Sequence, residues 1–555
     1  MEQALKLSDA AQLRTIVVDL TPVLPGGENG GAKVFVLELL RRLAERAPKT
    51  QFVLLTQASA HQELAVLDRD NVRRVMVAGA GGRLGMRSLA TKMYSRVLAH
   101  LPGRLRRAAG RLGHALLTAS KRSGSATLLQ DLNADLLFCP FTAPTYFELN
   151  IPTVCIIYDL QYKTYPEFFA PEDVAHRGRT FTEAVRRSTV LVAISDYSRD
   201  VAIAAAKLDP ARIKTIHLHI SRHSLRNAAR DETVLGRMQL TAGRYLIYPA
   251  NFWKHKNHEM LLTAFGIARH SGLADDIRLV CTGAPGARQQ WLKQAARGLG
   301  LEQHVLFPGY LANAELLALM TNSAGMIFPS LYEGFGLPVI EAMATGVPVA
   351  CSNVTSLPEV AGEAAILFDP RIPEQIAQAM ISLAHDKETT ARLVRNGEAR
   401  AASFSDSALM AEQYWELFQH TTGLNNPSNI LVGVHLDGWA GPASQLQIAP
   451  ATQPRTLDLE IALPAGAPTS EVTLLVLQDR ERRAEISVQR GQKGSVSVPL
   501  PASGGNISVV ISPCFIPAQT GAGDDQRELS AKLMKCEVVT ADGQRDVLFA
   551  ESTSA

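Results

Sequence analysis

Short apolar segments alternate with longer amphipathic segments from residue 14 to residue 420 of this 555-residue chain. Short buried strands separated by helices form parallel sheets that are covered by helices on both faces. The segments fall into two sets, so we predict two doubly wound α/β domains in tandem. The first set is Thr15–Asp19, Gln51–Leu55, Ala134–Cys139, Thr153–Tyr158 and Thr189–Ile194, and the second set is Tyr245–Pro249, Ile277–Thr282, Val305–Phe307, Gly325–Phe328 and Val347–Cys351.

The pattern changes after a polar, proline-containing segment, Thr421–Ser428. Apolar and polar residues then alternate with a period of two, which is typical of an antiparallel β-sandwich. These runs are Leu457–Leu463, Val472–Leu477, Ser495–Leu500, Ile507–Ile511 and Lys532–Val539. We therefore expect five parts. They are a first α/β domain (1–240, with a basic helical insertion at about 71–130), a second (241–406), a closing helix (407–420), a linker (421–428) and an all-β sandwich domain (429–555).

The composition is that of an ordinary globular protein, with 46% hydrophobic and 20% charged residues. A formal net charge of +3 is too small to argue for a nucleic-acid partner. The six cysteines form no C-x-x-C pair, which favours free thiols in a reducing compartment. We expect neither a signal peptide nor a membrane-spanning helix, and hence a cytoplasmic protein.

One region, Asn71–Gln130, carries many arginines and lysines but no acidic residue. Such a region could gather the protein at the inner face of an anionic membrane. It could equally be a solvated helical insertion, since Leu101-Pro102-Gly103 interrupts any single long amphipathic helix. Both interpretations stay open.

The most informative string, EGFGLPVIEA, begins at Glu333, directly after an apolar strand. Gly334 and Gly336 let the main chain approach a ligand closely. Pro338 suits the first turn of a helix, whose free amides would face a diphosphate. Glu333 could accept hydrogen bonds from sugar hydroxyls, and Glu341 from ribose hydroxyls. The alternative is a plain strand–loop–helix corner with two solvated glutamates, which the whole string disfavours.

Three further candidates follow predicted strands, where open α/β sheets bind ligands. Lys256 could neutralise a leaving diphosphate, although it could also be an ordinary surface lysine beside a helix that Asn257 caps. Asp159 could contact a donor or acceptor sugar, or simply form a turn. The glycine loop Gly26–Gly31 lacks the G-x-G-x-x-G spacing of dinucleotide sites, and a plain tight turn is its alternative.

At these residues the chain resembles a retaining glycosyltransferase of the GT4 family, from about residue 14 to residue 420. The E-x7-E string is the most specific element. The resemblance implies a GT-B fold, in which two Rossmann-like domains face across a cleft. It implies an acceptor domain at 1–240, a nucleotide-sugar donor domain at 241–406, a helix 407–420 that returns to the first domain, and no required metal or cofactor. It implies catalytic roles for Glu333, Lys256 and Asp159, and donor binding by Gly30, Gly31, Gly334, Phe335, Gly336, Leu337 and Glu341.

Two departures from the family's pattern concern the sugar pocket and the phosphates. Tyr158 stands where related sequences often have the histidine of an H-D-L motif. An arginine often found before the lysine motif has no counterpart, so phosphate neutralisation rests more heavily on Lys256 and backbone amides. The C-terminal domain resembles small β domains appended to bacterial polysaccharide-synthesis enzymes, on a string that begins at Phe515. That likeness leaves its role open.

We therefore expect transfer of a hexose, first of all mannose from GDP-mannose, to a bacterial surface glycan such as a lipopolysaccharide O-antigen, or to a lipid-linked saccharide. Retention of configuration is implied by the family. A sugar phosphorylase or a nucleotide-sugar epimerase with the same two-domain shell is the alternative. An oxidoreductase is disfavoured by the glycine spacing. Residues 429–555 could separately bind glycan or a partner enzyme.

Overall fold

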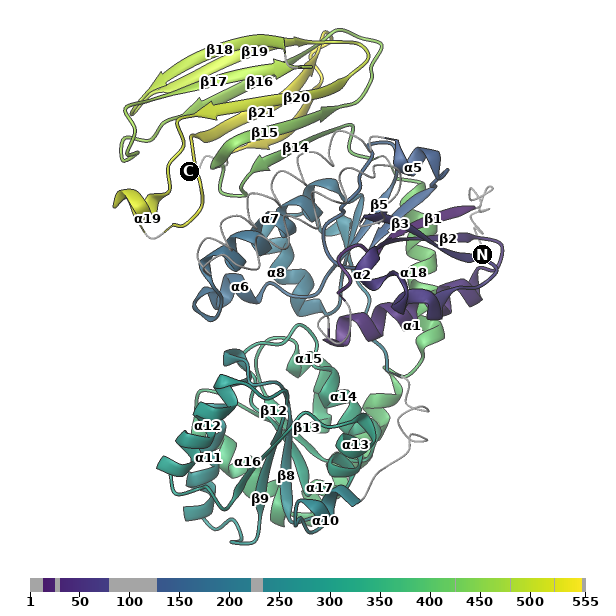
Figure 1. The fold of residues 1–555 in the computed structure, drawn as a ribbon, viewed down its shortest axis with the longest axis vertical. Helices are drawn as coiled ribbons and strands as arrows, with labels where there is room; N and C mark the ends of the chain where they lie inside the picture. The colour runs from purple at the N-terminus through teal and green to yellow at the C-terminus, as the bar shows by residue number, and fades with distance from the viewer. Residues whose placement is uncertain are drawn as a thin grey trace, which may run out of the picture. The chain divides into compact units, whose positions relative to one another are not determined.

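The computed structural model describes residues 13–24, 30–78, 127–220, 233–424, 426–479, 481–523 and 525–551 (Figure 1). Most of the basic region at 71–130 and the glycines at 26 and 27 lie outside these residues. By their contacts, the described residues group into two compact units. The first unit comprises Met1–Ile156, Pro171–Leu191 and Trp415–Ala555, and the second comprises Ile157–Ala170 and Val192–Tyr414.

The first sheet has the strand order β3-β2-β1-β4-β5-β6-β7. Its strands are β1 (Thr15–Asp19), β2 (Gln51–Gln57), β3 (Val72–Ala78), β4 (Leu136–Cys139), β5 (Thr153–Ile157), β6 (Val190–Ala193) and β7 (Ile213–Thr215). The α-helices of this region are α1 (Gly30–Arg46), α2 (Ala58–His61), α5 (Leu128–Asp131), α6 (Gln161–Thr164), α7 (Pro171–Arg187) and α8 (Asp196–Ala206). β1 pairs in parallel with β2 and β4, and successive side chains from Ile16 to Val18 are fully buried, as expected of a sheet covered on both faces.

The second sheet has the order β10-β9-β8-β11-β12-β13, and its strand pairs are parallel. Its strands are β8 (Tyr245–Pro249), β9 (Arg278–Thr282), β10 (Val305–Gly309), β11 (Gly325–Phe328), β12 (Val349–Ser352) and β13 (Ala365–Phe368). The helices are α10 (Thr233–Arg237), α11 (His258–His270), α12 (Ala287–Gly298), α13 (Asn313–Thr321), α14 (Leu337–Ala344), α15 (Leu357–Ala361), α16 (Pro373–His385) and α17 (Lys387–Ala402). Figure 1 shows α11 and α12 on one side of this sheet and α13 and α14 on the other. The two parallel α/β sheets expected from the sequence are confirmed.

A long helix, α18 (Ser407–Thr422), follows the second sheet. The ring of Phe418 on this helix lies 5.1 Å from that of Phe138 on β4, centre to centre. Its C-terminal half therefore packs on the first sheet within the first unit. The domain boundaries themselves stay a prediction.

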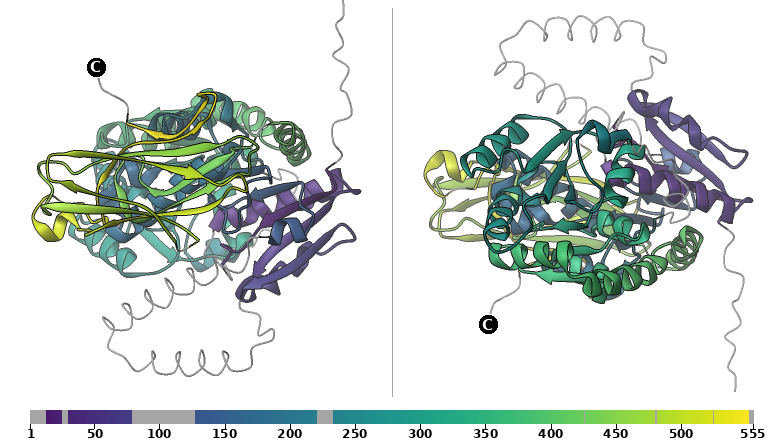
Figure 2. Two further views of the ribbon diagram at one scale, coloured as in Figure 1. Left: turned by 90° about the horizontal axis from the view of Figure 1, so that it is seen from above. Right: turned by 90° about the horizontal axis from the view of Figure 1, so that it is seen from below.

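The C-terminal region forms two antiparallel sheets, with orders β14-β15-β20-β17-β18 and β19-β16-β21-β22. Its elements are β14 (Asn429–Val434), β15 (Ala440–Ile448), β16 (Arg455–Ala462), β17 (Glu471–Gln478), β18 (Glu481–Gln489), β19 (Lys493–Leu500), β20 (Gly505–Ser512), α19 (Pro517–Thr520), β21 (Lys532–Thr540) and β22 (Arg545–Ala550). They are green to yellow in Figure 1 and are seen from a second direction in Figure 2. Leu457 and Ile461 of one sheet share a buried cluster with Leu474 and Val476 of the other, so the predicted sandwich is confirmed.

Among the residues that the structure describes, no helix is long and apolar enough to cross a membrane.

Candidate functional site

The loop that joins β11 to α14 contains most of the predicted site residues. Helix α14 begins at Leu337, so Pro338 is its second residue and lies in the first turn, as predicted. Gly336 precedes the helix with φ +107°, a left-handed conformation. A Cβ at Gly336 would lie 2.7 Å from Leu357 Cδ2, so only glycine fits here without strain. Because no helical turn precedes this corner, the first backbone amides of α14 have no carbonyl partner within the helix.

The main chain at Gly334 lies directly against the segment that contains Asp159. A Cβ at Gly334 would clash with the Tyr158 carbonyl oxygen and would lie 3.2 Å from Asp159 Cβ. Ser195 Oγ donates a hydrogen bond of 2.7 Å to the Gly334 carbonyl oxygen. Asp159 Oδ1 also accepts the Gln161 amide at 3.1 Å, the local turn that was the alternative reading of this residue. The structure thus brings Asp159 next to the loop between β11 and α14, at Gly334.

Lys256 and Glu333 form an ion pair, with Nζ 2.6 Å from Oε1. Their side chains are only 11% and 12% exposed. Lys256 ends the short 3₁₀ turn η4 (Lys254–Lys256), and Tyr248 on β8 donates its hydroxyl hydrogen to the Lys256 carbonyl oxygen at 2.8 Å. Two residues that are far apart in the sequence therefore meet in a largely buried contact. Each depends on the other, because losing one partner of a buried pair leaves an uncompensated charge.

The predicted helix cap at Asn257 is wrong in its detail. Asn257 precedes α11, but its backbone is left-handed, with φ +59°, and its side chain accepts no amide hydrogen bond from the helix. A side chain that caps a helix normally extends from a β-region backbone. Instead, Asn257 Nδ2 donates to the carbonyl oxygens of Pro329 and Pro370, at 3.1 and 2.8 Å. Asn257 therefore ties the start of the candidate loop to α11.

Two residues that support the loop between β11 and α14 belong to no motif that the sequence analysis could recognise. Ser356 is fully buried, and its Oγ lies 3.0 Å from the Glu333 carbonyl oxygen and 2.9 Å from that of Phe335. The Glu333 amide donates to Thr355 Oγ1 at 3.2 Å. These contacts hold the backbone of the loop on either side of Gly334. Only the fold brings them there, so no spacing rule could have found them.

Three further predicted residues lie on two separate helices, α14 and α1. Glu341 is on the second turn of α14, partly buried, and this burial raises the pKa of its carboxyl above the ordinary value. Gly30 and Gly31 begin α1 and are exposed. They belong to the first unit, whereas Glu333, Lys256, Asp159 and Glu341 belong to the second.

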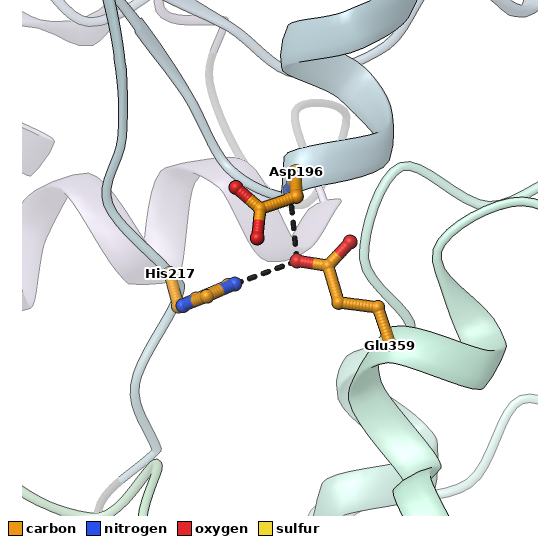
Figure 3. Close-up of side chains that lie close together, drawn as sticks. All are labelled: Asp196, His217 and Glu359. Carbon is orange, nitrogen blue, oxygen red and sulfur yellow. Dashed lines mark hydrogen bonds and ion pairs between the residues drawn. The ribbon is translucent and has the colours of Figure 1, made fainter.

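Asp196, His217 and Glu359 form a second cluster of polar side chains (Figure 3). Each offers one atom that could bind a metal ion, and these atoms lie within 4.8 Å of one another. Glu359 Oε1 accepts from His217 Nε2 at 2.7 Å and from the Asp196 amide at 2.8 Å, and Oε2 accepts the Tyr197 amide at 3.1 Å. Burial opposes ionisation of Glu359, but His217 and the two amides outweigh it and keep the pKa of the carboxyl below its ordinary value. Because these oxygens already accept hydrogen bonds, we interpret the cluster as a clamp between α15 and the N-terminus of α8.

Comparison with known proteins places these residues in a family. The family model described as "Glycosyl transferases group 1" matches residues 240–400, which include Lys256, Glu333 and Glu341. The O-antigen chain mannosyltransferase B of Escherichia coli is 31% identical over 270 residues, which cover 48% of this chain and 69% of that protein. The chain is a group 1 glycosyltransferase. It is therefore an enzyme of the GT4 family that transfers a glycosyl group.

Two further matches give this glycosyltransferase its context. The serotype-specific mannosyltransferase WbdA of E. coli is 38% identical over 111 residues, or 20% of this chain and 14% of that protein. The solved structure of HepE from Anabaena, in complex with UDP and glucose, aligns with a TM-score of 0.52 at 17% identity. That alignment covers 73% of this chain and 100% of the HepE chain. The likeness shows the GT-B fold, to which the glycosyltransferase adds its C-terminal β-sandwich.

Proposed function

We propose that the enzyme transfers mannose from GDP-mannose to a bacterial surface glycan, such as an O-antigen, or to a lipid-linked saccharide. The observation that carries this proposal is the 31% identity to an O-antigen mannosyltransferase across 69% of that protein. The matched family segment also contains Lys256 and the E-x7-E string. Guanine as the base and mannose as the sugar are parts of the proposal that a direct assay must establish.

The donor diphosphate would bind at the start of α14. The Gly336 and Leu337 amides and the positive end of the helix dipole favour an anion there. Lys256 supplies a full positive charge from η4. The backbone of Phe335 and Gly334 would border the donor, and Glu341, one turn into the helix, would accept hydrogen bonds from the ribose. Donor binding by Gly30 and Gly31 stays a prediction.

The ion pair between Lys256 and Glu333 suggests how donor binding prepares the site. In the structure, the two charges neutralise each other at 2.6 Å. A diphosphate is a stronger partner for Lys256 than one carboxylate, because it carries more negative charge. When Lys256 turns to the diphosphate, Glu333 is left to accept hydrogen bonds from the sugar hydroxyls. Both residues would then contact the donor at the point where its bond breaks.

The reaction would proceed with retention of configuration. The bond from the anomeric carbon to the phosphate oxygen breaks, and the acceptor oxygen bonds to the same face of that carbon. The departing diphosphate takes the acceptor's proton, so the step needs no separate protein base. Lys256 and the amides stabilise the negative charge on the leaving group, and Glu333 and Asp159 orient the sugar and the acceptor. The proposal requires no metal and no cofactor.

The predicted cytoplasmic location and contact with an anionic membrane are not needed for this chemistry and stay predictions.

Turnover of a donor panel tests the proposal. The purified enzyme would be given GDP-mannose, UDP-glucose or ADP-glucose with an O-antigen fragment as acceptor, and the product would be analysed by NMR. We expect product from GDP-mannose only, with the axial anomeric configuration of the donor kept. Preferred use of another nucleotide-sugar would contradict the donor assignment, and an inverted anomer would contradict the mechanism.

A further inference from the structure

A separate cavity of about 220 Å³ lies in the first unit, between α7 and the β-sandwich. Helix α7 contacts β14 at this point. None of the proposed donor-binding residues lines this cavity. Its charged and titratable lining residues are Arg179, Glu183 and Arg186 from α7, and His435, Arg527 and Glu528 from the sandwich domain.

One buried polar atom of the cavity lining, Arg186 Nη1, has no hydrogen-bond partner among the residues that the structure describes. Burial also lowers the pKa of Arg186 to about 10. Buried donors without acceptors are costly and rare, which indicates that an acceptor group belongs in this cavity.

On the sandwich side of the cavity, hydrogen bonds within the domain hold the charged side chains in place. The Arg527 guanidinium donates to Asp525 and Asp437, at 2.7 and 2.6 Å. Cys514 Sγ lies 3.0 Å from Glu528 Oε1 and donates to it. Because Arg527 is neutralised by two carboxylates, the positive charge left to meet a ligand is that of Arg186, together with Arg179 at the exposed rim, and the lining carboxylates Glu183 and Glu528 limit its excess.

We propose that this cavity binds a sugar residue that carries a carboxylate. A guanidinium and a carboxylate match in shape and form paired, charge-assisted hydrogen bonds. Glu183 on α7 and Glu528 on the sandwich side disfavour a dianion such as phosphate, but they can accept hydrogen bonds from sugar hydroxyls. The enzyme acts on saccharides, so an acidic sugar in a glycan is the ligand of this chemistry that it meets. The site goes beyond the proposed function and does not depend on the identity of the donor.

Binding of methyl α-D-glucuronide to the full-length enzyme, measured by isothermal titration calorimetry, tests this assignment. We expect Arg186→Gln to weaken binding by about tenfold or more, the loss of a charged hydrogen bond, and Arg179→Gln to weaken it less. Arg177→Gln, on α7 but outside the cavity lining, is the matched control and should bind as the wild type does.

Methyl α-D-glucoside and acetate are the comparison probes. The glucoside lacks the carboxylate and acetate lacks the sugar ring, so each should bind much more weakly than the glucuronide. Equal binding of acetate would overturn the sugar assignment, and equal binding of the glucuronide by the wild type and either arginine variant of the cavity, Arg186→Gln or Arg179→Gln, would overturn the site. GDP-mannose turnover without the glucuronide should be unchanged in all these variants, so a wrong donor assignment would be recognised separately.

Discussion

Gly334, like Gly336, is a residue of the candidate site with no room for a side chain. An added Cβ would clash with the backbone carbonyl of Tyr158, which cannot move as a flexible side chain would. We expect Gly334→Ala to lower the free energy of unfolding by about 1–3 kcal/mol, as overpacking does, and to reduce turnover by displacing Glu333. Urea denaturation with a parallel turnover assay measures both effects.

Gly298→Ala is the control for this substitution. Gly298 ends α12, and a Cβ there would meet nothing within 4 Å. Its free energy of unfolding should stay unchanged or rise by up to about 1 kcal/mol. If both alanine variants behave alike, the close approach of the loop to Tyr158 is wrong.

His258 should make stability depend on pH. Burial lowers the pKa of its imidazole to about 3, with Lys256 and Arg288 adding to the shift. In the unfolded chain the group binds a proton near pH 6.5, so the unfolded state holds more protons between pH 6.5 and 3. The free energy of unfolding should therefore fall as pH is lowered through that window, by up to about 1.4 kcal/mol per pH unit from this group.

The His258→Gln variant should lose this part of the slope when urea denaturation is repeated at pH 7, 6 and 5. His270 lies on the same helix and is exposed, so His270→Gln should keep the wild-type slope. A wild-type slope in His258→Gln would show that the buried imidazole is not held neutral.

At the scale of elements, Glu359 joins α15 to the N-terminus of α8 (Figure 3). Its pKa is lowered in the fold, so its ionised form contributes stability above the ordinary carboxyl range, and that contribution is lost as pH falls through the lowered pKa. Glu359→Gln should cost about 1–2 kcal/mol at pH 7 and much less near pH 3. Thermal unfolding at the two pH values measures the difference.

The exposed Glu363, four residues further along, is the matched control. Glu363→Gln should change the unfolding temperature little at either pH. A Glu359→Gln effect of the same size at pH 3 and pH 7 would contradict the ionised clamp.

Elements with a clear apolar pattern could be predicted from the sequence. β1, β8 and β11 have the expected bounds because their central side chains are all buried. β3 and β18 were missed since VRRVMVA and ERRAEISVQ carry charged residues, which edge strands tolerate. Their pairing depends on the neighbouring strand rather than on their own pattern.

The candidate site was only partly predictable for a similar reason. The E-x7-E string is local, so Glu333 and Glu341 could be recognised from their spacing. The ion pair between Lys256 and Glu333 joins two different loops and needs the fold to be seen. Ser356 supports the loop through backbone carbonyls, which leave no trace in the residue types.

At the scale of the whole molecule, the sandwich has a hydrophobic core of its own. Chains with several cores usually unfold in more than one step. Leu474 is fully buried in the sandwich core, so Leu474→Ala should cost about 2–5 kcal/mol and move one calorimetric transition to lower temperature. Thr473→Ala, on the other face of β17, should move it by far less. A single transition that shifts as a whole would contradict independent cores.

The account depends most on the claim that a nucleotide diphosphate binds at the start of α14 with Lys256 as its cationic partner. Titration of GDP against Lys256→Met and Lys254→Met tests it directly, because both lysines belong to the same 3₁₀ turn and only Lys256 is buried against Glu333. We predict that Lys256→Met weakens GDP binding by about tenfold or more, whereas Lys254→Met changes it less than about twofold. Equal GDP affinity in the wild type and Lys256→Met would contradict the proposed site.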